Sequence, residues 1–159
     1  MRSLGVDLGD VRIGLALSDP DGRVATPLET LAVRDADDLE GIAASLVAAA
    51  RRHGAQVVVI GLPRSLAGDE REPAQRARQI AGHVAQASGL EVHLWDERLT
   101  TVEAERTMLA QGAKRRERRA ALDRVAATLL LQTFLDARGG IGRFSPSPGQ
   151  GGEHEHGSR

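Results

Sequence analysis

Acidic residues follow two segments of this sequence that are typical of β-strands. Asp7 ends a short apolar run and is flanked by glycines in Gly5-Val6-Asp7-Leu8-Gly9, and Asp96 and Glu97 directly follow the run at 91–95. On parallel strands these positions share one edge of the sheet, outside the carboxyl ends, where open α/β sheets bind ligands. Turn chemistry or an ordinary polar loop is the alternative for each. Either Asp96 or Glu97 is placed to face a site with Asp7.

A third acid, Asp123, lies in a long helical segment beside the small pair Ala126-Ala127. Small side chains would let the helix approach the sheet closely there, so that the carboxylate of Asp123 faces Asp7. The alternative is a solvated aspartate that pairs with Arg119 or Arg124 on its own helix. Asp123 is therefore a candidate only in combination with the other two acids.

Three carboxylates at one place would suit a hard divalent cation. Mg²⁺ prefers oxygen ligands and commonly joins a protein through a few carboxylates and a substrate phosphate. A pair of such ions can activate a water and stabilise the leaving oxygen in phosphodiester cleavage. The glycine-rich segments match neither a Walker loop nor a dinucleotide-binding fingerprint, and no nucleophilic-serine elbow is present. The acids therefore favour metal-dependent hydrolysis.

Cations gather immediately before Asp123. The segment 114–119 carries five positive residues and one negative residue, a net charge of +4. A solvated helix start is the ordinary interpretation, but cations are unfavourable at a helix N-terminus, which favours phosphate binding. We predict a nucleic-acid-binding surface that comprises Lys114, Arg115, Arg116, Arg118 and Arg119, with Arg12 and Arg98 added to it.

Composition excludes several classes of protein. The 159 residues contain no Cys, which excludes disulfide scaffolds, thiolate zinc sites and cysteine nucleophiles. Aromatic residues make up 2%, which argues against a base-stacking platform, and the net charge of −1 argues neither for nor against nucleic acid. Apolar runs such as 57–62 are too short to cross a bilayer, and an acid as early as Asp7 interrupts any signal-peptide core. We expect a cytoplasmic protein.

The elements that must position the acids alternate between strand and helix periods. Expected strands are 4–8, 11–17, 24–33, 56–62 and 91–95, and expected helices are 39–50, 69–88, 100–110 and 116–137. An antiparallel three-strand meander followed by β-α-β crossovers predicts an α/β fold. Its mixed five-stranded sheet would have two parallel strands beside the meander and helices on both faces.

Two local details are also predicted. Asp37 and Glu40 form a plausible capping pair at the start of the helix at 39–50. The buried side of the last helix is expected to carry Leu122, Val125, Ala126, Leu129, Leu130 and Thr133.

The sequence predicts one folded domain at 1–138 and a tail at 139–159. The tail carries seven Gly, three Ser and two Pro with almost no apolar residues. Such a segment cannot bury enough surface to offset the entropy of ordering it, so we expect a disordered tail. Its two histidines, His154 and His156, are expected to be solvated rather than bound to metal.

Four groups of motifs, in this order, resemble a known family. They are Gly5-Val6-Asp7-Leu8-Gly9 with Arg12-Ile13-Gly14-Leu15-Ala16 and Ser18-Asp19; Gly61-Leu62-Pro63; Asp96-Glu97-Arg98-Leu99-Thr100-Thr101 with Ala104-Glu105; and Asp123 with Ala126-Ala127 and Leu131-Gln132. Together they make residues 3–136 similar to the YqgF (RuvX) family. The segment Arg64-Ser65-Leu66-Ala67-Gly68 departs from the Leu-Asn-Met-Asp-Gly that is more usual there.

The resemblance implies a ribonuclease H-like fold and a bacterial cytoplasmic nuclease that uses Mg²⁺ or Mn²⁺. It implies that Asp7, Glu97 and Asp123 are the catalytic and metal-binding acids. Family members are described as nucleases that mature the 5′ end of precursor 16S ribosomal RNA, and as Holliday junction resolvases. We expect the first activity. Cleavage of branched DNA, or a non-catalytic nucleic-acid-binding or ribosome-associated role, stays open as an alternative.

Overall fold

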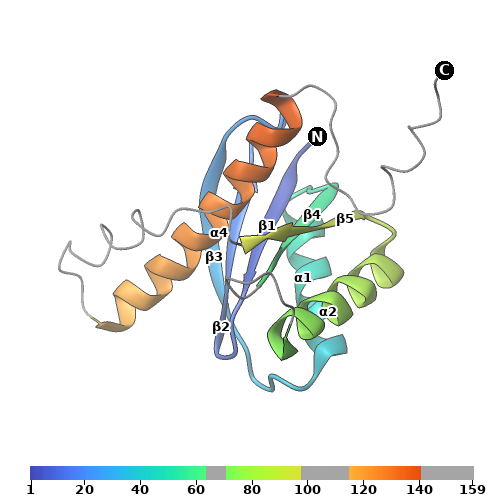
Figure 1. Ribbon diagram of the computed structural model, residues 1–159, viewed down its shortest axis with the longest axis vertical. Coiled ribbons are helices and arrows are strands. Elements are labelled where there is room, and N and C mark those ends of the chain that lie inside the picture. Colours follow the sequence, from blue (N-terminus) through green and yellow to red (C-terminus); the bar gives the residue numbers. More distant parts are fainter. Residues whose placement is uncertain (64–70, 98–114, 141–159) are drawn as a thin grey trace.

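The computed structural model describes residues 1–63, 71–97 and 115–140 (Figure 1). In chain order its elements are β1 (Ser3–Leu8), β2 (Arg12–Ser18), β3 (Ala25–Ala32), α1 (Leu39–Arg52), β4 (Val57–Leu62), α2 (Glu72–Ser88), β5 (Glu91–Asp96) and α4 (Arg115–Gly140). These confirm the expected strands and helices within the described residues. Helix α2 begins at Glu72, later than expected, because Arg71 before it has an extended backbone; Pro73 stands in the first turn, where proline is tolerated.

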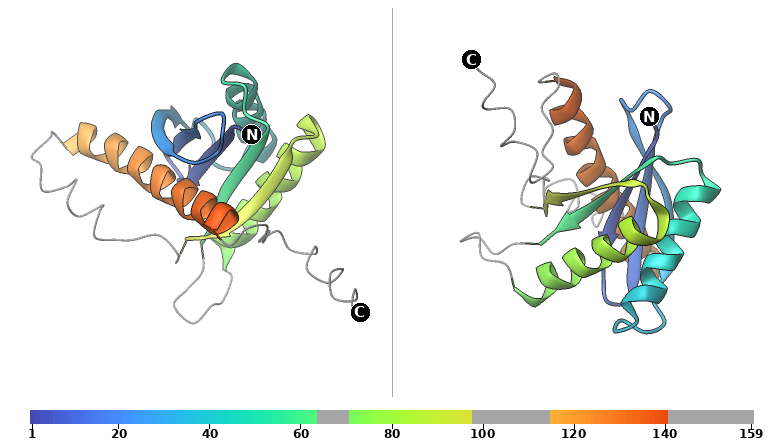
Figure 2. Two further views of the ribbon diagram at one scale, coloured as in Figure 1. Left: turned by 90° about the horizontal axis from the view of Figure 1, so that it is seen from above. Right: turned by 90° about the vertical axis from the view of Figure 1, so that its right-hand side faces the viewer.

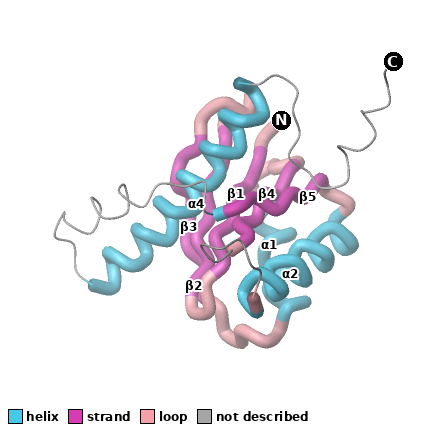
Figure 3. Tube along the Cα trace, viewed as in Figure 1, coloured by secondary structure: helices cyan, strands magenta, loops and turns pink. Residues whose placement is uncertain are grey.

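The five strands form one mixed sheet in the order β3-β2-β1-β4-β5, the central layer of Figure 3. Strands β1, β2 and β3 pair antiparallel, whereas β4 is parallel to both β1 and β5. Every residue of β4 is buried, because strands flank it on both sides and helices cover both faces of the sheet. The prediction of a meander joined to two parallel strands is confirmed.

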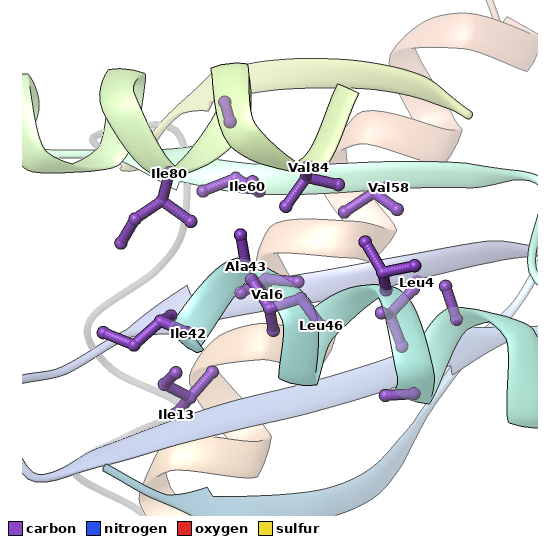
Figure 4. Packing of buried hydrophobic residues seen from close by; sticks show 14 of the residues in the cluster. Leu4, Val6, Ile13, Ile42, Ala43, Leu46, Val58, Ile60, Ile80 and Val84 are labelled. Carbon is purple, nitrogen blue, oxygen red and sulfur yellow. The ribbon is translucent and has the colours of Figure 1, made fainter. Parts of the chain in front are cut away.

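Helices cover the two faces of the sheet unequally. Helices α1 and α2 lie together on one face, and α4 crosses the other (Figure 2). Every second residue of β1 points to the same face of the sheet. Leu4 and Val6 thus point into the core beneath α1 and α2, together with Leu46 and Ile80 (Figure 4). A second apolar cluster, which includes Trp95, lies beneath α4. Within the described residues, α4 is the helix that packs on this face of the sheet.

The buried stripe of α4 differs from the prediction. Only Leu130 of the six expected residues is buried; Leu122, Val125, Ala126, Leu129 and Thr133 are partly exposed. The residues that do pack on the sheet are Ala127, Leu130, Leu131, Phe134 and Leu135. Apolar residues occupy several sides of this helix, so a helical period alone does not single out the face that is buried.

Polar contacts fix the second half of α4 to β5. The indole Nε1 of Trp95 donates a hydrogen bond to Thr133 Oγ1 at 2.9 Å, and Arg138 Nη2 donates to Glu91 Oε2 at 2.9 Å. Burial raises the pKa of Glu91, but hydrogen bonds from His93 and Arg138, with the charge of each, outweigh this effect and hold that pKa below its usual value. The crossing of α4 over the sheet is thereby set at its carboxyl half.

Helix α1 has an aspartate cap one residue away from the predicted one. Asp38 is the N-cap, and its Oδ1 accepts a hydrogen bond from the backbone N–H of Gly41 at 3.0 Å. The predicted pair of Asp37 and Glu40 is wrong, because the backbone N–H of Asp37 is bound to Asp35 Oδ1 in a turn that precedes the helix.

We expect Asp38→Ala to lower the free energy of unfolding by about 1 kcal/mol, since it leaves an N-terminal amide of α1 without its acceptor. Asp37→Ala is the matched control, because it removes the same side chain one residue earlier without touching the cap. Urea denaturation of the two variants and the wild type measures the difference. Equal losses in both variants would contradict the assignment of the cap to Asp38.

Several expectations lie outside the described residues. These are the helix at 100–110, the side chains of most of the cation cluster, and the tail with its two histidines. Helix α4 continues to Gly140, slightly beyond the predicted end of the domain at 138. None of the helices in the described ranges is long and apolar enough to span a membrane.

Candidate active site

Asp7 lies near the carboxyl end of β1 on the face of the sheet that α4 covers. Along this strand Val6 points into the core beneath α1 and α2, whereas a side-chain carbon at Gly5 would meet α4. Because side chains alternate along a strand, Asp7 points to the same face as Gly5. It is partly buried, and in the antiparallel pairing with β2 it stands opposite Gly14.

Glu97 immediately follows β5, and its carboxylate lies over Gly61 of the neighbouring strand β4. A Cβ at Gly61 would come within 2.7 Å of Glu97 Oε2, so glycine at this position leaves the room that the carboxylate occupies. Asp96 instead pairs with Leu62 in the parallel register of β4 and β5. The sequence did not decide whether Asp96 or Glu97 faces the site. In the structure, the carboxylate of Glu97 lies over β4.

A cleft of about 630 Å³ opens at this edge of the sheet, and both Asp7 and Glu97 line it, whereas Asp96 does not. Its other lining residues come from the turn between β1 and β2, from the segment before α1, and from the first half of α2. The volume is typical of a ligand site. Two carboxylates at the ends of strands that are distant in the sequence therefore line one cleft.

Asp123 lies on the same face of the sheet, where α4 crosses β2. Its backbone carbonyl occupies the space that a Cβ at Gly14 would need, and Gly14 is the residue opposite Asp7. Its carboxylate accepts a hydrogen bond from Arg12 Nε at 2.8 Å, in an ion pair whose side chains are 30% and 26% exposed for Arg12 and Asp123. The partner of Asp123 is thus an arginine of β2, and neither of the two arginines on its own helix.

The acids fit a hard divalent cation in their chemistry, but they are not gathered around one point. Asp7 and Glu97 offer the oxygen donors that Mg²⁺ and Mn²⁺ prefer, in one cleft. Across residues 1–63, 71–97 and 115–140, no group of three or more His, Asp or Glu side chains is placed to hold a metal ion. The expected third ligand, Asp123, is directed to Arg12.

The cations predicted for nucleic-acid binding are only partly described. Arg12 forms the ion pair with Asp123, and Arg119 is exposed near the start of α4. Arg98 and Lys114 lie outside the described residues, as do the side chains of Arg115, Arg116 and Arg118.

Sequence reasoning missed Arg76, a partly buried residue of α2 that lines the cleft with Asp7 and Glu97. Nothing local distinguishes it from Arg78, the other arginine of α2. The crossover after β4 was a usable signal, because it carries the start of the next helix to the edge of the sheet where the acids lie.

The fold has known relatives among solved structures. The structure described as "T. thermophilus RuvC in complex with Holliday junction substrate" superposes with a TM-score of 0.57 and 17% sequence identity, over 90% of this chain and 98% of that chain. A second Thermus thermophilus RuvC structure gives a TM-score of 0.50 over 88% and 97% of the two chains. With the mixed sheet and its helices on both faces, this likeness defines a ribonuclease H-like domain.

A family model described as "RuvX: Holliday junction resolvase" matches residues 1–137. The chain belongs to the RuvX family. A relative from Pelotomaculum thermopropionicum, named "Putative pre-16S rRNA nuclease", is 42% identical over 98% of this chain and 99% of its own length. A relative of the same name from a Nocardioides strain is 46% identical over 87% of this chain and 90% of its own.

Proposed function

We propose that this protein is a metal-dependent endonuclease that processes the 5′ end of precursor 16S ribosomal RNA in the cytoplasm. The observation that carries the proposal is the meeting of Asp7 and Glu97 in one cleft at the carboxyl edge of the sheet. The names of relatives that are similar over nearly the whole chain support the choice of substrate. Precursor RNA, free or within ribosomal particles, is the proposed partner.

In this proposal Asp7 and Glu97 hold Mg²⁺ or Mn²⁺, and Asp123 joins them once it leaves Arg12. An ion held by these residues would supply the activation of a water and the stabilisation of the leaving oxygen of the phosphodiester. The protein itself supplies the positions of the carboxylates: Gly61 leaves room for Glu97, and Gly14 lets α4 bring Asp123 close to the strand that bears Asp7. In this proposal Arg12, freed from Asp123, binds phosphate. Arg98 and the cations at 114–119 are proposed for the same role from the sequence alone.

Branched DNA is the second candidate substrate, because the family model carries the description of a Holliday junction resolvase. The similar RuvC structures share only 17% of their sequence with this chain, so they support the fold and leave the choice between RNA and DNA open.

The decisive experiment compares two substrates under the same conditions. Purified protein is incubated with a precursor 16S RNA fragment and with a four-way DNA junction, each with Mg²⁺, with Mn²⁺ and with a chelator. We expect cleavage of the RNA that requires the divalent ion. Cleavage of the junction alone would reverse the order of the candidates, and tight binding of RNA without cleavage would favour a non-catalytic, ribosome-associated factor.

A further inference from the structure

Arg76 is held in the wall of the cleft by two backbone carbonyls. Its Nε donates to the carbonyl oxygen of Ala36 at 3.4 Å, and its Nη2 donates to that of Gly9 at 3.5 Å. Gly9 follows the end of the strand that bears Asp7, so these contacts place the guanidinium at the loop directly after this acid. The side chain therefore reaches from α2 to the turn after β1.

Both contacts are long for hydrogen bonds, which are usually 2.7–3.2 Å from nitrogen to oxygen. A guanidinium has five N–H donors, and these two weak contacts leave most of its capacity unused. Within the described residues Arg76 forms no ion pair, although Glu72 stands one turn before it on α2 and lines the same cleft. A partly buried arginine in this condition can still accept a strong anionic partner.

The charge of the cleft explains why such a partner would need Arg76. Five acids line the cleft, namely Asp7, Asp10, Asp37, Glu72 and Glu97, and Arg76 is the one Lys or Arg among the described lining residues. A nucleic-acid backbone is repelled by these carboxylates wherever nothing neutralises them. Divalent ions at Asp7 and Glu97 would neutralise one part of the cleft, and Arg76 provides positive charge from helix α2.

We propose that Arg76 binds a backbone phosphate of the RNA strand, next to the phosphate that is cleaved, and thereby positions the strand across Asp7 and Glu97. The planar guanidinium suits phosphate oxygens because it can donate two parallel hydrogen bonds. This inference rests on the proposed function, and it assigns that site a phosphate-binding residue from α2. A purely structural role, in which Arg76 only ties the Gly9 turn to the segment before α1, is the competing explanation.

Binding of a precursor 16S RNA fragment, measured without divalent ions at about 50 to 200 mM salt, tests the proposal. We expect Arg76→Gln to weaken binding about tenfold at low salt. The slope of log K against log salt should also fall by about 1, as for the loss of one phosphate contact. Arg76→Lys keeps the charge and should keep the slope. Arg51→Gln is the matched control, since Arg51 is exposed in the last turn of α1, at the opposite edge of the sheet.

A structural role predicts a different pattern. Arg76→Gln would then lower the melting temperature while the salt slope stays that of the wild type, and this result would overturn the proposal. Arg76→Met, which keeps an unbranched apolar chain, gives the same comparison if glutamine prevents folding. If the wild-type protein binds the four-way DNA junction and not the RNA, the choice of RNA fails. The same variants on the junction then decide whether Arg76 binds phosphate.

Discussion

Asp7→Asn is expected to lower the rate of RNA cleavage about 10³-fold, which corresponds to about 4 kcal/mol of transition-state stabilisation. The amide keeps the size of the side chain but removes its negative charge, so the cation at the carboxyl edge of the sheet loses a ligand. Because Asp7 is only partly buried and stands opposite a glycine, we expect the fold to survive. Single-turnover cleavage of the precursor fragment measures the loss, and circular dichroism verifies the fold.

Asp10→Asn is the matched control for this substitution. Asp10 lines the same cleft from the turn after β1, so the variant makes the same chemical change nearby and should leave the rate almost unaffected. Mn²⁺ binding in the absence of RNA, followed by electron paramagnetic resonance, gives a second measurement that should weaken in Asp7→Asn and Glu97→Gln. If the Asp7→Asn variant cleaves RNA at the rate of the wild type, the assignment of Asp7 to the active site is wrong.

Asp123→Asn distinguishes two roles of this carboxylate, as a metal ligand and as the partner of Arg12. If the carboxylate leaves Arg12 to join the metal, this variant should lose activity to a similar degree as Asp7→Asn. If the ion pair with Arg12 is its whole role, Asp123→Asn should lower stability and keep most of the activity. The same cleavage and unfolding measurements distinguish the two results.

The sheet could be predicted from sequence because its signals are local. The β-branched run of β4 indicates a strand covered on both faces, and the short break between β1 and β2 indicates a hairpin. The buried face of α4 could not be predicted in this way. It depends on which of several apolar sides meets Trp95 and the glycines of the sheet, and that choice is made by contacts between distant segments.

The residues of the candidate site also differ in whether a local signal or a contact between distant segments positions them. That Asp7 would share an edge of the sheet with an acid at 96 or 97 could be predicted, because both stand at the end of a strand. The topology did not choose between Asp96 and Glu97; that choice came from the family resemblance. The pairing of Asp123 with Arg12 was missed, because it joins a helix to a strand far away in the sequence. Arg76 was missed for a similar reason: its place in the cleft follows from how α2 returns to the sheet, which no local motif records.

Gly14→Ala is expected to lower the free energy of unfolding by about 3 kcal/mol, because it overfills the contact between β2 and α4. The added Cβ would lie 2.0 Å from the backbone carbonyl oxygen of Asp123, and a backbone atom cannot turn aside as a flexible side chain can. Helix α4 must move away from the sheet, and it carries Asp123 with it. We therefore expect a loss of cleavage activity in addition to the loss of stability.

The matched control is Gly82→Ala in the middle of α2, where an added Cβ meets nothing within 4 Å. Alanine favours a helix by about 1 kcal/mol over glycine, so this variant should be more stable than the wild type and equally active. Thermal unfolding should then separate the two variants in opposite directions. A Gly14 variant as stable and active as the wild type would mean that α4 does not need its close approach to β2 to bring Asp123 to the site. The ion pair with Arg12 would then have to be the contact that holds Asp123 there.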